Sequence, residues 1–214
     1  MAVTPGHTAI TSGSIGSRSR PTREVPPLEL PASVEELANE AAAQLGWDGV
    51  VLPQQRILGR KVCVVARLRT DVHAERIATG IGPVTDRASV ATWSWPELAG
   101  SVPEKAVEIV GVMAVERHWR TALASTVPFS RYGEAAMVLP SSGVMTRDYV
   151  DNCLPRARIY GLAVVSADQD AIVDLDLGGR TERMTLGEDA VSRWFNEVVY
   201  EQLLAAGEIS ASVD

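Results

Sequence analysis

The chain has 214 residues, of which 46% are hydrophobic, and it carries a formal net charge of −7 at pH 7. This length and apolar content suffice for one sizeable core, so we expect one folded domain with a tail rather than two domains. An acidic chain is poorly suited to bind nucleic acid over its whole surface, although it is compatible with a local basic face. No apolar run reaches the roughly 18 residues that span a membrane, and the first residues lack a signal-peptide pattern. We therefore expect a cytoplasmic protein without a membrane partner.

The pattern of cysteines and histidines predicts no structural metal site. Cys63 and Cys153 lie in segments that we interpret as a buried strand and a buried helix, which favours two free thiols over a disulfide. The histidines at positions 7, 73 and 118 share no metal-ligand spacing. A zinc site is therefore not expected.

The first part of the chain predicts a tail, a helix and a strand. Residues 1–31 are rich in Ser, Pro and Arg and have almost no periodic apolar content, so we expect a disordered tail. Ser33 and Glu36 have the spacing of a capping box and begin an amphipathic helix that ends at Gly46. A short strand at 50–52 and a β-branched run at 59–68 then read as parts of the sheet.

The next segment, residues 69–104, has the weakest pattern. Glycines and a proline at 80–83 separate two modestly apolar flanks, which predicts a hairpin with an edge strand near residues 90–95. In such a strand Trp93 and Trp95 would point to one face, where they either cover the sheet or form a binding platform.

The stretch from Val107 to Pro140 organises the chain. An apolar run at 109–115 ends at Glu116, a polar segment follows, and a second apolar run at 135–139 ends at the proline. Short buried runs of this kind predict strands, and the crossover between them is long enough to hold a helix. We expect these two strands to be parallel neighbours.

The remainder predicts further helices and strands. A helix begins at Thr146 and is broken into two pieces by Pro155, and strands at 162–165 and 171–175 follow. A second capping box, Thr185 with Glu188, begins a long helix that Gly207 ends.

The order of these elements predicts an α/β fold, a three-layer sandwich with a central mixed β-sheet. We expect a tail at 1–31, the α/β domain at 32–180, and a C-terminal helix at 181–214. That helix packs either on the domain or on a partner.

Four fragments occur in a recognisable order: GRKVCVV from Gly59, VMAVERHWRTAL from Val112, AAMVLP from Ala135 and YGLAVV from Tyr160. In this order they resemble the restriction-endonuclease-like, or PD-(D/E)xK, nuclease superfamily, over roughly residues 33–176. The resemblance implies that fold and a Mg²⁺-dependent cleavage of DNA. An Asp and a Glu from adjacent strands would hold the metal, and a Lys two residues after the Glu would position the attacking water.

The resemblance assigns candidate site residues and also departs from the family pattern. Glu116 takes the position of the Glu and is the implied metal ligand, while His118 replaces the Lys and Cys63 replaces the Asp. A thiol is a poor magnesium ligand, although His118 can serve as a general base. An active site would need Asp71 or Asp86 to supply the missing carboxylate. The alternative is that Glu116 and His118 only cap a strand end.

Arginines gather in sequence around the predicted crossover helix and the helix after it. They predict a face that contacts phosphate groups or an acidic protein surface, and the candidates are Arg117, Arg120, Arg131, Arg156 and Arg158.

Three functional hypotheses follow. The first is a nuclease-fold domain with impaired catalysis, which acts as a DNA- or protein-binding regulatory module and needs no cofactor. The second is an active DNA endonuclease that uses Mg²⁺ with Glu116 and His118. The third is a structural interaction protein, in which the C-terminal helix docks on a partner or forms a homodimer through Trp194, Phe195 and Tyr200.

Overall fold

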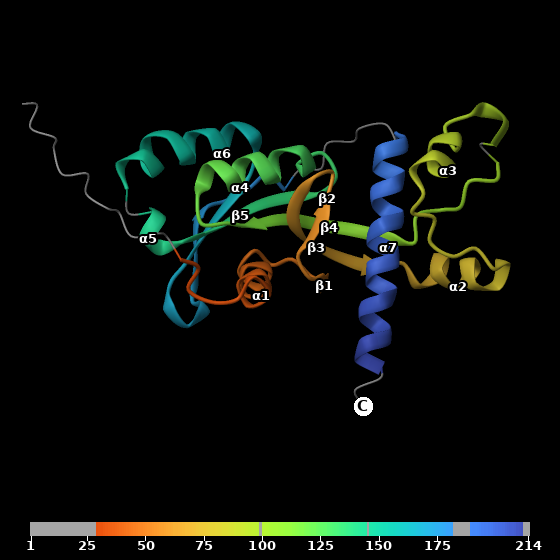
Figure 1. Ribbon diagram of the computed structural model, residues 1–214, viewed down its shortest axis with the longest axis horizontal. Coiled ribbons are helices and arrows are strands. Elements are labelled where there is room, and N and C mark those ends of the chain that lie inside the picture. Colours follow the sequence, from red (N-terminus) through yellow and green to blue (C-terminus); the bar gives the residue numbers. More distant parts are fainter. Residues whose placement is uncertain (1–28, 99, 145, 182–188, 212–214) are drawn as a thin grey trace, which may run out of the picture.

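The computed structural model describes residues 29–98, 100–144, 146–181 and 189–211. It is an α/β fold with a mixed seven-stranded sheet and helices on both faces (Figure 1), as the sequence predicts. The strand order is β1-β3-β4-β5-β6-β7, and β2 pairs with β3 off this path. The strands are β1 (Val50–Val51), β2 (Gln55–Ile57), β3 (Arg60–Leu68), β4 (Val107–Val115), β5 (Glu134–Pro140), β6 (Ala163–Ala167) and β7 (Val173–Leu177).

The centre of the sheet is parallel. β4 pairs with β5 and β5 with β6 in parallel, while β3 and β7 flank these strands antiparallel. The predicted parallel pair at 109–115 and 135–139 is therefore confirmed, with Val115 in register with Val138. The crossover between them holds a helix, as parallel neighbours require.

Helices cover the sheet unevenly. Figure 1 shows α1 below the sheet, α4 and α6 above it, and α7 crossing the end of the sheet at β3 and β4. The helices are α1 (Val34–Gln44), α2 (Thr70–Thr79), α3 (Arg87–Thr92), α4 (Trp119–Thr126), α5 (Ser141–Val144), α6 (Leu154–Tyr160) and α7 (Ala190–Ala211). Short turns are η1 (Pro96–Leu98), η2 (Val127–Phe129), the π-helical η3 (Tyr149–Cys153) and η4 (Gln169–Ala171). None of these helices combines the length and the apolar character needed to cross a bilayer.

Alternate residues of the central strands belong to different layers of the core. On the α1 side, Leu37 and Ala41 pack with Cys63 and Met113. On the opposite side, the next residues of the strands pack under α7 or under α4 and α6. Burial on both faces explains why these strands have continuous apolar runs instead of an alternating pattern.

The predicted capping box at the start of α1 is present. The backbone N–H of Glu36 donates to Ser33 Oγ at 3.2 Å, and the Ser33 N–H donates to the Glu36 carboxylate at 3.1 Å. Hydrogen bonds from Ser33 lower the pKa of Glu36. The helix therefore starts where the sequence predicts.

The predicted hairpin in residues 69–104 is wrong, because this segment is helical. α2 ends at Gly80, which adopts a left-handed φ of 71°. α3 begins after Asp86, whose side chain accepts from the Ser89 N–H at 2.8 Å. Trp93 follows α3 and is half-buried, and Trp95 is 56% exposed, so the two rings do not share a strand face.

Two helix boundaries also differ from the prediction. Pro155 lies in the first turn of α6, where its missing N–H is tolerated, and the chain enters α6 directly from the π-helical η3. α7 continues past Gly207 to Ala211. The predicted capping box at Thr185 and Glu188 lies outside the described residues, as do residues 1–28 of the predicted tail.

α7 packs on its own domain. Phe195 and Tyr200 are buried in the core with β3 and β4, and the Phe195 ring lies 5.5 Å from the Phe129 ring. Trp194 is half-buried, and its indole N–H donates to the Thr85 carbonyl at 2.8 Å. The side chains that we considered for a homodimer therefore form intramolecular contacts instead.

Candidate nucleic-acid interface

Cys63 and Glu116 do not share a pocket, although β3 and β4 are neighbours. Cys63 is in register with Met113 and lies in the core layer beneath α1, where it is fully buried. Burial raises the pKa of its thiol to about 12. Along β4, Met113 and Val115 face this layer and Ala114 faces the other. The alternation directs Glu116 to the face away from Cys63, so the predicted convergence is wrong.

The remaining residues of the nuclease-like set are also dispersed. His118 is exposed at the start of α4, and its side chain makes no capping hydrogen bond. Asp71 and Asp86 follow the carboxyl end of β3, whereas Glu116 follows the carboxyl end of antiparallel β4. These ends lie roughly 30 Å apart, because a strand rises about 3.3 Å per residue. Among the described residues, no group of three or more His, Cys, Asp and Glu is arranged to hold a metal ion.

Arginines do gather where α4 and α6 lie side by side on the sheet. Arg120 and Arg156 approach the ring of Trp119, with their guanidinium carbons 4.3 and 5.5 Å from its centroid. The indole N–H of Trp119 donates to Asp148 at 2.9 Å, and Arg120 forms an ion pair with the same carboxylate. Hydrogen bonds from Trp119 and Arg120 lower the pKa of Asp148. Trp119 therefore contacts two cationic groups through its ring.

The hairpin between β2 and β3 adds a second basic group beside α4. Ile57 pairs with Arg60, and the two residues between them, Leu58 and Gly59, have φ values of 49° and 76°. Positive φ at both positions is the geometry of a type I′ turn. The guanidinium of Arg56 donates to the Gly59 carbonyl at 3.1 Å. β3 contacts α4. By strand alternation Arg60 lies on the side of Ile57 and Val62, away from α1, whereas Arg56 and Lys61 oppose each other on the side of Cys63.

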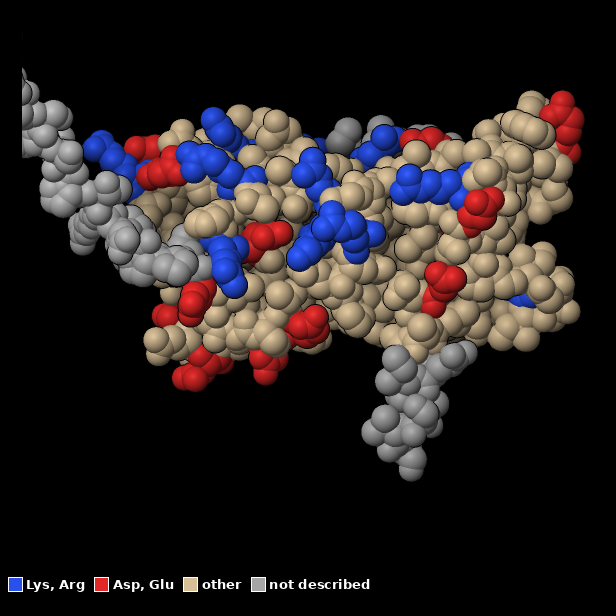
Figure 2. Space-filling model, in the orientation of Figure 1, with Lys and Arg blue, Asp and Glu red and all other residues tan. Residues whose placement is uncertain are grey.

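We define the basic face by its exposed cationic side chains that form no ion pair with any described residue. It comprises Arg60, Arg117, Arg156 and Arg158. Figure 2 shows Lys and Arg gathered over α4, α6 and the β2–β3 hairpin, while several Asp and Glu side chains lie along the α1 side. A local positive surface thus stands out on a chain whose net charge is −7.

The sequence identified only part of this face. Arg117, Arg156 and Arg158 were predicted, and they lie on it. Arg60 was missed as a binding residue, because the run at 59–68 was interpreted only as a strand of the sheet. The local signal for this turn is weak, because two-residue turns of this type prefer Asn-Gly or Asp-Gly, and here Leu58 occupies the first position with positive φ.

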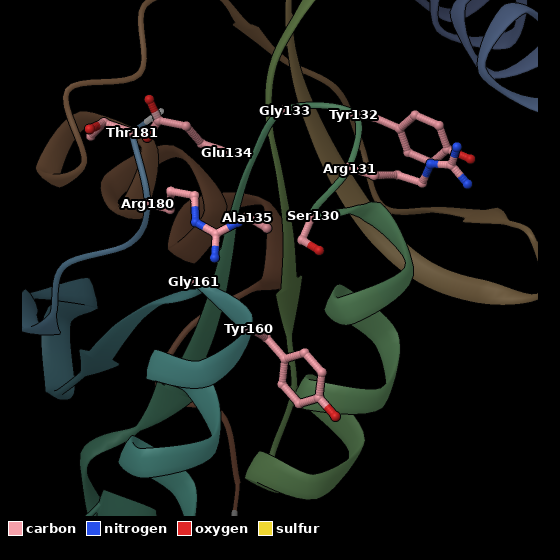
Figure 3. Close-up of a pocket in the computed structure, with 10 residues that line it drawn as sticks. All are labelled: Ser130, Arg131, Tyr132, Gly133, Glu134, Ala135, Tyr160, Gly161, Arg180 and Thr181. Atoms are coloured by element: carbon pink, nitrogen blue, oxygen red, sulfur yellow. The ribbon is translucent and has the colours of Figure 1, made fainter. Parts of the chain in front are cut away.

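Arg131 lies in a different place from the basic face. It follows η2, at the opposite end of α4 from Arg117, and forms an ion pair with Asp189 at 2.9 Å. It also lines a small cavity of about 70 Å³ at the amino ends of β5 and β6. In Figure 3, Arg180 and Ser130 border this hollow while Arg131 points away from it. We therefore leave Arg131 out of the proposed interface.

The basic face is suited to contact a polyanion, since its guanidinium groups can each approach a phosphate. Comparisons with protein-family models, curated proteins and solved structures find no match to this chain.

Proposed function

We propose that this chain is a nucleic-acid-binding module that holds duplex DNA through the basic face and does not cleave it. The observation that carries this proposal is the set of exposed basic side chains just before α4, on α6 and at the β2–β3 hairpin, which have no ion-pair partners among the described residues. An arginine already paired with a carboxylate gains little from a phosphate. Unpaired arginines release the condensed counterions of DNA when they bind, which favours association.

The local contacts of two basic groups support the proposal further. Arg156 stacks near Trp119, and the β2–β3 hairpin has a two-residue turn with little freedom. Preorganised side chains lose less conformational entropy when they bind. The face is thus better suited to a regular phosphate backbone than a set of flexible lysines would be.

The proposal that the module does not cleave rests on the arrangement of the nuclease-like residues. Cys63 is buried beneath α1 and Glu116 is directed to the other face. A magnesium ion held between two strands needs oxygen ligands that converge. We infer that the resemblance to the nuclease superfamily extends to the order of elements and to DNA contact, without a metal site.

The proposal is tested by fluorescence anisotropy with a labelled duplex and the full chain. We expect binding that weakens steeply between about 50 and 200 mM salt, because each neutralised phosphate adds about −0.9 to the slope of log K against log salt. EDTA should leave the affinity unchanged, and incubation with Mg²⁺ should leave the duplex intact.

A matched pair of double variants separates the basic face from charge in general. Arg117→Gln with Arg158→Gln removes two charges from the face, and we expect about tenfold weaker binding with the slope smaller by about 2. Arg67→Gln with Arg69→Gln removes two charges from arginines that already pair with Asp48, Glu108, Asp71 and Glu104. Equal losses in both variants, or binding that salt does not weaken, would contradict the proposal.

A further inference from the structure

A groove separate from the basic face lies between α2 and the C-terminal half of α7. Figure 1 shows that half of α7 extending past the sheet beside α2. The groove has a volume of about 620 Å³, within the range typical of ligand sites. Its walls are mostly apolar, and they include Leu68, Ile77, Ile81, Pro83, Leu203 and Leu204.

One wall of the groove is polar and connects to a buried ion pair. Arg76 and Glu197 pair at 2.7 Å with side chains only 3% exposed, and the Arg76 guanidinium carbon lies 5.1 Å from the centroid of the Tyr200 ring. The Tyr200 hydroxyl lies 2.8 Å from Nδ1 of His73. Burial raises the pKa of Tyr200, so its hydroxyl keeps its proton.

The hydrogen bonds of this wall determine what it offers to a ligand. The Tyr200 hydroxyl and Nδ1 of His73 share a hydrogen bond, and the tautomer of the imidazole decides which of the two donates. When the imidazole is neutral, donation from Tyr200 to Nδ1 places the ring hydrogen on Nε2. His73 lines the groove, and in this tautomer its second ring nitrogen carries the hydrogen. None of the described lining residues is Asp or Glu.

We propose that this groove binds a small amphiphile with an unbranched apolar body and a carboxylate head, and that Nε2 of His73 donates to the head. The apolar walls accommodate the hydrocarbon. The absence of carboxylates among the described lining residues favours an anionic head over a cationic one, even on a chain of net charge −7. This inference is independent of the proposed binding of DNA.

The test is isothermal titration of the full chain with decanoate and with decylamine, which have the same apolar body and opposite charge. We expect decanoate to bind one to one and about tenfold more tightly than decylamine. His73→Asn keeps an acceptor near the Tyr200 hydroxyl but removes the Nε2 donor. It should weaken the binding of decanoate about tenfold and leave decylamine little changed.

A steric pair of variants tests the location of the site. A side chain at Gly207 would enter open space on the groove wall, so Gly207→Trp should fold normally and abolish decanoate binding. Ala205→Trp adds the same bulk at an exposed position of α7 outside the groove, and it should leave binding unchanged. Equal affinity for the two amphiphiles, or undiminished binding to a folded Gly207→Trp chain, would overturn the proposal.

Discussion

Cys63 shows how one residue decides between two interpretations of this chain. It lies on β3 at the position where the nuclease resemblance requires an acid. Its thiol is fully buried among apolar side chains, and burial raises the pKa to about 12. A thiol in this environment behaves as a small apolar group. The layer that surrounds it is built to exclude water rather than to hold a hydrated ion.

Cys63→Asp should therefore destabilise the fold instead of creating a metal site. An unpaired carboxylate at a fully buried position is expected to cost more than about 3 kcal/mol of unfolding free energy. Urea unfolding with and without Mg²⁺ measures this effect, and Cys63→Ala serves as the control for lost volume. A rise in stability of the aspartate variant on addition of Mg²⁺ would show that a metal site exists there after all.

At the scale of elements, contacts with α7 explain why the segment after β3 is helical. Arg76 of α2 pairs with Glu197 of α7, whose carboxylate also accepts the Val84 N–H at 3.0 Å. Arg87 of α3 stacks over Trp194 with its guanidinium carbon 4.0 Å from the ring centroid. These partners lie more than a hundred residues apart in sequence, so the local pattern contains no trace of them.

Removing one partner of the buried pair should be far more damaging than removing both. Glu197→Gln leaves the Arg76 charge buried without a counter-ion, and we expect a loss of about 3–5 kcal/mol in unfolding free energy. Replacing both, with Arg76→Met and Glu197→Leu, should recover most of that loss, because no uncompensated charge remains. Chemical denaturation of both variants gives the comparison.

The exposed pair Arg147–Asp151 on the surface provides the control for these variants. Asp151→Asn should change stability by less than about 0.5 kcal/mol, since an exposed pair four residues apart contributes little. A similar effect of Asp151→Asn and Glu197→Gln would contradict a special role for the buried pair.

At the scale of the whole molecule, several carboxylates stabilise the fold in their charged form. Hydrogen bonds lower the pKa of Asp86, Asp148 and Asp189. A carboxyl group whose pKa is lower in the folded state than in the unfolded state stabilises the fold. This stabilisation is fully present at pH values above the unfolded-state pKa, and it is lost as the pH falls through the folded-state pKa. We therefore expect the fold to weaken below the ordinary aspartate pKa of about 3.9.

Asp189 allows a specific test of this pH dependence. Its carboxylate accepts from the Ser192 N–H at 2.7 Å and pairs with Arg131, and the bond from the Ser192 backbone is the main reason for its lowered pKa. Asn also caps helices well, so Asp189→Asn removes the charge and keeps the cap. When thermal unfolding is measured from about pH 6 down to about pH 2, the melting temperature of this variant should fall less steeply than that of the unaltered chain. Asp174→Asn, at an exposed position of β7, is the control. If Asp189→Asn loses stability with falling pH as steeply as this control does, the prediction is contradicted.

The sequence by itself determined the elements whose signals are local. The Ser33 capping box predicted the start of α1, and the buried runs before Glu116 and Pro140 predicted β4 and β5 with a crossover between them. These signals are strong because a cap needs residues a few positions apart and a doubly buried strand needs only its own apolar run. The α/β class and the parallel centre of the sheet followed from them.

Only the tertiary structure decided which side chains meet. Register and strand alternation separated Cys63 from Glu116. Packing on α7 favours the helices α2 and α3 where the glycines predicted a hairpin. The basic face arose because a turn at 58–59 lies beside α4, across a long separation in sequence. These arrangements depend on contacts between segments that are distant in sequence, and such contacts form only when the hydrophobic core packs during folding.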